Sequence, residues 1–135
     1  MPATVLDSYA LLAYFRGEPA GESVRDLLQK AGKADKPVHM TEVNYAETQY
    51  MIRRKDGAQA WAEAAKILAA LPIKFHPATR ELADLAADFK ARFRFSLTDA
   101  FAAALAKKLR ADLVTGDPEF AAVKDEVNIT WLDKK

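Results

Sequence analysis

Short apolar, β-branched segments alternate along this chain with longer segments of helical periodicity. Strands are predicted at residues 3–6, 37–40, 72–76, 113–115 and 127–132. Helices are predicted at residues 8–15, 21–29, 42–54, 58–71 and 80–91, with a polar loop at 30–36 and a further helix starting at 96–99. Strands separated by helices favour a parallel sheet. The prediction is therefore an α/β fold, one domain spanning residues 1–135, with a central parallel sheet and helices on both faces.

The helix that starts at residues 96–99 has a clear apolar repeat. Leu97, Phe101, Leu105 and Leu109 recur every four residues and are predicted to form its inward face. A short strand follows this helix and stops at the turn residues 116–118, which are predicted to start another helix.

The helix predicted at residues 42–54 carries a carboxylate among apolar positions. Val43, Ala46, Tyr50 and Met51 form a stripe at three- and four-residue steps, and Glu47 lies within it. Charged groups are seldom fully buried unless they are paired or bind a metal, so Glu47 is predicted to have a partner. Glu42 lies in the first turn, where the helix dipole alone accounts for a negative charge.

Three more carboxylates lie where strands end or helices begin. Asp7 and Asp117 follow two predicted strands, and Asp99 lies in the first turn of a helix. Because the carboxyl ends of parallel strands form the ligand-binding edge of a sheet, these residues and Glu47 are predicted to converge. Each aspartate also has a purely structural explanation as a cap or first-turn charge, and at this stage both explanations stay open.

A group of four carboxylates indicates a divalent cation, because without one the charges repel each other. Oxygen ligands with no cysteine, and no histidine close to them in sequence, suit Mg²⁺, with Mn²⁺ as the alternative. Such a site is suited to phosphoester hydrolysis. Ser8 and Thr115 are candidates to orient a carboxylate or a metal-bound water, although capping explains them equally well.

Composition narrows the functional classes. Twenty basic and 19 acidic residues give a net charge of +1, which excludes a nucleic-acid binder held mainly by its overall charge. The absence of cysteine excludes disulfides and thiolate metal sites and agrees with a cytoplasmic protein. The first residues contain neither a basic leader nor an uninterrupted apolar run, so neither a secretion signal nor a membrane span is expected.

Four segments, in order, resemble the PIN-domain ribonucleases, specifically the VapC-type toxins of bacterial and archaeal toxin–antitoxin pairs. They are VLDSYALLA, TEVNYAE, SLTDAFAAALA and LVTGDPEF. The resemblance implies that Asp7, Glu47, Asp99 and Asp117 form a catalytic, metal-binding site, with Thr115 beside it. It places the family's second acid at Glu47 rather than at Glu42.

The same resemblance implies Mg²⁺-dependent hydrolysis of RNA, a VapB-like antitoxin that blocks the site, and a homodimer. Isolated histidines, His39 and His76, are not needed for this chemistry. Basic residues that offer a path for the RNA backbone are Arg53, Arg54, Lys55, Lys90, Arg92 and Arg94, with Phe93 or Phe95 as a stacking surface. Antitoxin contacts are expected among Tyr45, Tyr50 and Trp61, near the helical hairpin.

Two other functions compete with this one. In a phosphotransfer or phosphatase domain Asp7 would be the nucleophile, but such sites place a second acid very near the first, and Ser8, Tyr9 and Ala10 follow here. In a catalytically silent module that binds protein or RNA, the acids would be caps only. Metal-induced stabilisation separates this last possibility from the nuclease.

Overall fold

The computed structural model describes residues 2–132. Its centre is one five-stranded sheet in which all neighbouring strands are parallel, in the order β3-β2-β1-β4-β5. The strands are β1 (Thr4–Leu6), β2 (Val38–Thr41), β3 (Ile73–His76), β4 (Asp112–Thr115) and β5 (Ile129–Trp131). The predicted parallel α/β fold is confirmed. The carboxyl ends of β1 and β4, which are neighbours in the sheet, lie side by side.

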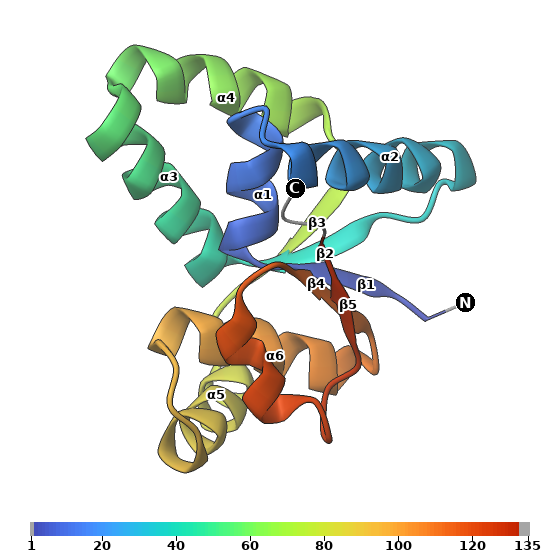
Figure 1. The fold of residues 1–135 in the computed structure, drawn as a ribbon, viewed down its shortest axis with the longest axis vertical. Coiled ribbons are helices and arrows are strands. Elements are labelled where there is room, and N and C mark those ends of the chain that lie inside the picture. Colours follow the sequence, from blue (N-terminus) through green and yellow to red (C-terminus); the bar gives the residue numbers. More distant parts are fainter. Residues whose placement is uncertain (1, 133–135) are drawn as a thin grey trace.

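Helices cover both faces of the sheet (Figure 1). One face carries α1 (Ser8–Phe15), α2 (Pro19–Ala34), α3 (Glu42–Asp56) and α4 (Ala58–Ala70), and the other carries α5 (Arg80–Arg92) and α6 (Leu97–Leu109). A 3₁₀ helix, η1 (Pro118–Val123), follows β4. Among residues 2–132, no helix combines the length and apolar character that a membrane crossing requires.

Side-chain caps fix where several helices begin. Asp7, Thr41, Thr79 and Ser96 each accept a hydrogen bond from the backbone N–H three residues later. Such caps satisfy N–H groups that have no partner within the helix. These contacts also determine the positions of the strand-to-helix junctions, so the sequence around the sheet's carboxyl edge sets that edge's geometry.

Helix α6 is buried nearly all round, and this makes one sequence prediction partly wrong. Phe101 and Leu105 are buried as expected, but Leu97 is 53 % exposed. The small side chains from Ala102 to Ala104 are fully buried, because α6 packs against the sheet, α5 and α3 at once. Alanine allows close approach on several sides, so an every-fourth-residue leucine face does not describe this helix.

One predicted boundary is also wrong. Helix α2 is longer than predicted and continues through most of the expected loop at residues 30–36, ending where Asp35 adopts a left-handed conformation with φ of 54°. Ala31 packs into the core, which keeps this last turn helical. After Asp117 the chain forms a 3₁₀ rather than an α-helix.

Candidate active site

Asp7 is the most deeply buried carboxylate at the sheet's carboxyl edge, with 1 % of its surface exposed. Its Oδ1 accepts a hydrogen bond from Ala10 N–H at 2.9 Å, and its Oδ2 accepts one from Thr115 Oγ1 at 2.5 Å. The pKa of Asp7 is raised to about 7, mainly by burial and to a smaller extent by the charges of Asp99 and Asp117, against the lowering effect of both hydrogen bonds. Asp7 is therefore a helix cap and also part of an acidic group.

Thr115 connects the ends of two neighbouring strands. Its hydroxyl donates to Asp7 and accepts a hydrogen bond from the Asp117 N–H at 3.0 Å. Asp117 in turn caps η1, because its Oδ1 accepts from Glu119 N–H at 3.0 Å. One buried threonine thus sets the separation between the first and last aspartates of the predicted site.

Asp99 enters the site from α6. Ser96, not Asp99, caps this helix, since Ser96 Oγ accepts from the Asp99 N–H at 3.0 Å. Burial raises the pKa of Asp99 to about 6, with further contributions from the charges of Asp117, Glu47 and Glu119. Asp99 is an acid in the first turn of α6 and its carboxylate is hydrogen-bonded to Ser96, so the structural explanation still holds for it, while the carboxylate also lies among other acids.

Three carboxylates lie close enough to share one cation. Asp99, Asp117 and Glu119 each offer an oxygen atom within 4.8 Å of the other two. None of them, nor Asp7 or Glu47, belongs to the ion pairs found within residues 2–132. The donor set is oxygen-only and its charge is uncompensated, which fits a hard divalent cation. Glu119 was missed by the sequence prediction, although it follows Asp117 by two residues in the same turn.

Glu47 lies beside this group, although for a different reason than the one predicted. Its charge raises the pKa of Asp99, so the two carboxylates are near one another. The predicted apolar stripe is partly wrong: Val43 and Met51 pack against the core, but Ala46 and Tyr50 are exposed, and the buried side chains of α3 are Asn44, Thr48 and Ile52. Glu47 is only partly buried. Glu42 is exposed in the first turn of α3.

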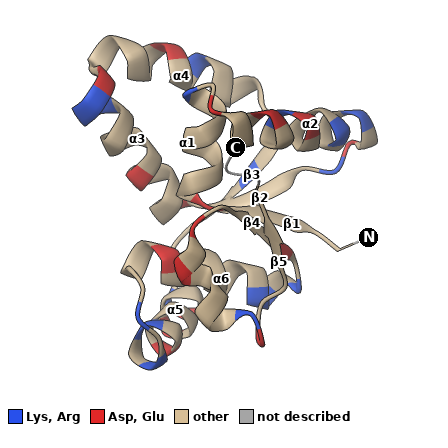
Figure 2. Cartoon of the chain, viewed as in Figure 1, with Lys and Arg blue, Asp and Glu red and all other residues tan. Residues whose placement is uncertain are grey.

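Acidic segments from four parts of the chain gather at one end of the sheet. Figure 2 shows acidic colour on α3, at the start of α1, at the start of α6 and just after β4. Residues 4–126 match the PIN domain family. The chain belongs to the PIN domain family.

Several solved structures similar to this PIN domain are described as toxin–antitoxin proteins. DNA-bound VapBC from Salmonella typhimurium matches with a TM-score of 0.78 and 13 % identity, covering 96 % of this chain and 98 % of that one. VapBC2 from Rickettsia felis, bound to a promoter DNA fragment, gives 0.76 and 15 %, covering 97 % and 99 %. VapC20 from Mycobacterium tuberculosis, described as a toxin that cleaves the sarcin–ricin loop, gives 0.71 and 21 %, covering 90 % and 95 %. A search of curated protein sequences found no match.

Asn44 is a buried polar residue of α3 that hydrogen-bonds to Ser8, the residue after Asp7, and it was missed by the sequence prediction. It is fully buried, and its Nδ2 donates to Ser8 Oγ at 3.1 Å while its backbone carbonyl accepts from Ser8 Oγ at 3.3 Å and from Thr48 Oγ1 at 2.9 Å. Thr41 Oγ1 accepts from Asn44 N–H at 2.9 Å and also contacts Asn44 Oδ1. These bonds join α3 to the residue after Asp7. Asparagine is unfavourable inside a helix, which was the available signal.

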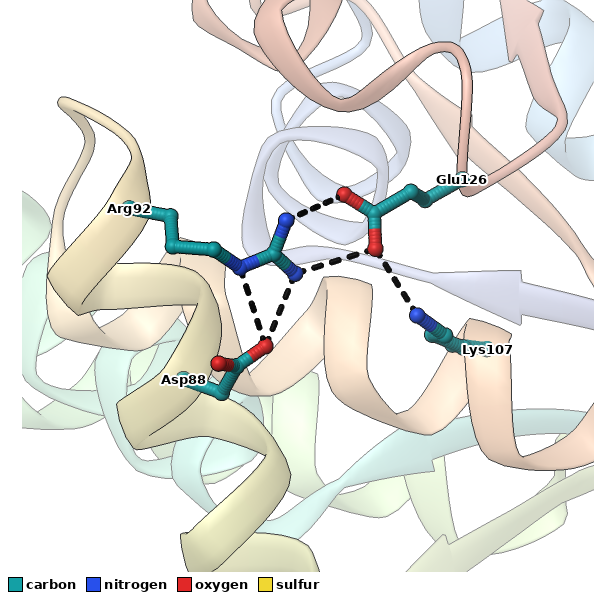
Figure 3. Close-up of polar contacts among 4 residues, drawn as sticks. All are labelled: Asp88, Arg92, Lys107 and Glu126. Atoms are coloured by element: carbon teal, nitrogen blue, oxygen red, sulfur yellow. Dashed lines mark hydrogen bonds and ion pairs between the residues drawn. The ribbon is translucent and has the colours of Figure 1, made fainter.

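Part of the predicted RNA path is unavailable because its residues are engaged elsewhere. Arg92 donates to Asp88 and Glu126 at 2.6–3.1 Å, and Lys107 donates to Glu126 at 2.8 Å (Figure 3). Phe95 is buried in the core, and Phe93 packs against it. The stacking prediction is therefore wrong for Phe95, whereas for the partly exposed Phe93 it stays a prediction. The other basic residues of the predicted path are exposed: Arg53, Arg54, Lys55, Lys90 and Arg94.

The two histidines are not isolated, contrary to the prediction. They project from neighbouring strands β2 and β3, with His39 Nδ1 and His76 Nε2 2.8 Å apart. Partial burial and nearby lysines, Lys74 for both rings and Lys108 for His76, lower the pKa of each histidine. A hydrogen-bonded pair of neutral imidazoles at the β3 edge of the sheet accounts for both residues.

Proposed function

We propose that this PIN domain is a metal-dependent endoribonuclease that hydrolyses RNA phosphodiester bonds. The observation that carries the proposal is the convergence of Asp7, Asp99, Asp117 and Glu119, with Glu47 beside them. Among residues 2–132, none of these acids belongs to an ion pair. A divalent cation balances this charge and leaves room for a substrate phosphate. The description of VapC20 as an RNA-loop-cleaving toxin supports the same substrate class.

In this proposal Asp99, Asp117 and Glu119 hold the cation, which is Mg²⁺ with Mn²⁺ as a substitute. When bound, the metal supplies an acidified water and neutralises charge on the phosphate. The protein's own part is orientation: Thr115 fixes the Asp7 carboxylate, Ser96 fixes the start of α6, and Asn44 fixes α3 against α1. Asp7 and Glu47 complete the acidic site as further ligands or as hydrogen-bond acceptors for the attacking water.

We further propose that the protein is a VapC-type toxin, controlled by a VapB-like antitoxin, that acts on cytoplasmic RNA as a homodimer. Similar folds occur in the VapBC structures from Salmonella typhimurium and Rickettsia felis. A toxin of this kind needs its carboxylate site covered until it acts. A basic antitoxin segment placed beside the uncompensated acids would achieve that electrostatically.

The test combines cleavage with metal binding. Wild-type protein, Asp99→Asn and the control Asp26→Asn, which changes an exposed acid on α2, are incubated with a pool of single-stranded and structured RNA in Mg²⁺, Mn²⁺ or EDTA. We expect metal-dependent cutting by the wild type and the control only. Metal should also raise their melting temperature by linkage. A folded wild type that neither cuts nor gains stability from metal would instead be a silent binding module.

A further inference from the structure

The solvent-facing side of α3 carries a line of residues that leads away from the acidic group. Glu47, Tyr50 and Arg54 are spaced by three and four residues, so they follow one line along the helix. Tyr50 is 48 % exposed, and the Arg54 guanidinium lies 5.2 Å from the centre of its ring. An exposed aromatic ring and a cation therefore follow Glu47, whose charge raises the pKa of Asp99.

These side chains border a shallow hollow of about 400 Å³ on α3. Its lining consists of Ala46, Gln49, Tyr50, Arg53 and Arg54. The small side chain of Ala46 opens the end nearest Glu47. With its amide oriented toward its neighbours, Gln49 accepts hydrogen bonds from Arg53 Nη1 at 3.1 Å and from Trp61 Nε1 of α4 at 3.2 Å, which holds Arg53 at the rim.

The charge of this hollow is available for a ligand. Within residues 2–132 neither Arg53 nor Arg54 forms an ion pair with a carboxylate, whereas Arg92 is paired twice. The end of α3 is strongly basic, because Lys55 follows the two arginines (Figure 2). Tyrosine and arginine occur in protein interfaces as well as in nucleic-acid sites, but here two arginines without a carboxylate partner within residues 2–132 flank one exposed aromatic ring, which favours an anionic ligand. A polyanion with flat, stackable groups fits this surface.

We propose that the hollow on α3 is a nucleotide subsite for single-stranded RNA. A base stacks on Tyr50, and the flanking phosphates pair with Arg53 and Arg54, so the strand runs along α3 and reaches the acidic group past Glu47. This subsite rests on the proposed nuclease function and names how its substrate is held. In this proposal Tyr50 takes the stacking role that was predicted for Phe93 or Phe95. Phe95 is buried in the core, and Phe93 packs against it.

Binding is measured separately from cleavage so that the two proposals fail independently. Tyr50→Ala, Tyr50→Phe, Arg54→Ala and the control Arg25→Ala, which removes an exposed cation on α2, are made in the Asp99→Asn protein. Their affinity for a fluorescently labelled single-stranded RNA is measured in Mg²⁺ at several salt concentrations. The same four changes in the otherwise wild-type protein are assayed for kcat and KM.

We expect Tyr50→Ala to weaken RNA binding about 5- to 150-fold, the range found for loss of one stacked base, and Tyr50→Phe to keep most of the affinity. Arg54→Ala should reduce the slope of log affinity against log salt by about 0.7, as for one lost phosphate contact on a single strand. KM should rise while kcat changes little. Arg25→Ala should behave like its parent.

The subsite would be overturned if Tyr50→Ala bound RNA as tightly as its parent. It would also be overturned if Tyr50→Phe lost as much RNA affinity as Tyr50→Ala. If Tyr50→Ala changed only the inhibition by a partner protein and left RNA binding unchanged, this face of α3 would be assigned to that protein and the RNA subsite would be overturned. If no RNA is cut but Tyr50→Ala weakens RNA binding, the subsite stands and the nuclease function fails.

Discussion

Two groups of carboxylates in this protein have opposite electrostatic surroundings. In the described part of the chain the acids at the sheet's carboxyl edge form no ion pair, and the pKa is raised, mainly by burial, to about 7 for Asp7 and to about 6 for Asp99. Near the surface, Glu126 accepts hydrogen bonds from Arg92 and Lys107, which lower its pKa to about 2 (Figure 3). The paired group favours the fold, whereas burial of the unpaired acids opposes it.

The contrast explains where charge contributes to stability and where it contributes to function. The Arg92 network connects α5, α6 and the segment before β5, all on one side of the sheet. The charged groups of this network are hydrogen-bonded to one another, so little of their charge is available to bind a ligand. The acidic group instead uses neutral partners, namely Thr115, Ser96 and backbone N–H groups, to hold its carboxylates in place.

The largest expected effect comes from removing the buried charge with Asp7→Asn. Asparagine keeps an acceptor for Ala10 N–H but removes a carboxylate from the site, so RNA cleavage should fall more than about 100-fold, exceeding the usual loss for an indirect ligand contact. Stability should not fall with it, because the substitution removes an unfavourable buried charge.

The raised pKa of Asp7 also predicts how the stability of the wild type changes with pH. The folded-state pKa of Asp7 is about 7, above the ordinary value of 3.8, so the folded protein binds the extra proton. Without metal, wild-type stability should therefore decrease as pH rises from about 4 to 7, by an amount on the order of a few kcal/mol. Urea unfolding in EDTA at pH 5 and pH 8 measures it. The raised pKa of Asp7 would be contradicted if the difference in unfolding free energy between wild type and Asp7→Asn were the same at pH 5 and at pH 8.

A second change tests the neutral partners that hold the acids. Asn44→Ala removes the amide that bonds to Ser8 and contacts Thr41, leaving buried hydroxyl groups without it. We expect a loss of about 1–3 kcal/mol in unfolding free energy and a fall in kcat, because α3 carries Glu47 one turn later.

The matched control for Asn44→Ala is Thr48→Val, which removes only a hydroxyl bonded to the Asn44 carbonyl. It should cost less stability and leave kcat close to wild type. Chemical denaturation and RNA cleavage are measured on the same preparations. Equal kcat values for the two variants would mean that Asn44 supports the fold but does not position the site.

Gly116 provides a smaller test, at the turn between Thr115 and Asp117. A Cβ atom at this position would lie 2.3 Å from the Tyr9 ring, so Gly116→Ala must displace the ring or the turn. Cleavage should fall by about 10-fold or more, in line with small displacements of catalytic groups. In contrast, Gly32→Ala within α2 meets nothing closer than 3.9 Å and should leave cleavage unchanged. Similar activity in both alanine variants would show that the turn tolerates movement.

The sequence predicts this fold well where the patterns are local. Strand–helix alternation and the caps Asp7, Thr41 and Thr79 depend on neighbouring residues, and all are present in the structure. The convergence of Asp7, Asp99 and Asp117 follows from parallel strands, which is why three acids far apart in sequence were placed together. The assignment of catalytic and metal-binding roles to these acids and to Glu47 remains a prediction.

The failures share a physical cause, which is packing between distant elements. The exposure of Tyr50, the burial of Asn44 and the alanine-lined environment of α6 depend on how α3 and α6 contact other helices, and periodicity along one helix does not record this. The His39–His76 contact depends on strand register. Glu119 was missed because a residue exposed in a turn resembles any surface acid until Asp99 is placed beside it.

The smallest expected effect concerns the paired group. Glu126→Gln removes the shared partner of Arg92 and Lys107, which lie near solvent, so the melting temperature should fall only slightly at pH 7 and less in high salt. Because the pKa of Glu126 is lowered from 4.5 to about 2, its contribution is present above pH 4.5 and is lost as pH falls toward 2. The difference in stability between wild type and Glu126→Gln should therefore shrink on acidification, whereas RNA cleavage at pH 7 stays unchanged.

Thermal melts across pH 2–7 measure the change in stability, and the RNA assay measures cleavage. A large loss of cleavage in Glu126→Gln would show that the two carboxylate groups are coupled through α6, and the division between stabilising and functional charge would then have to be abandoned.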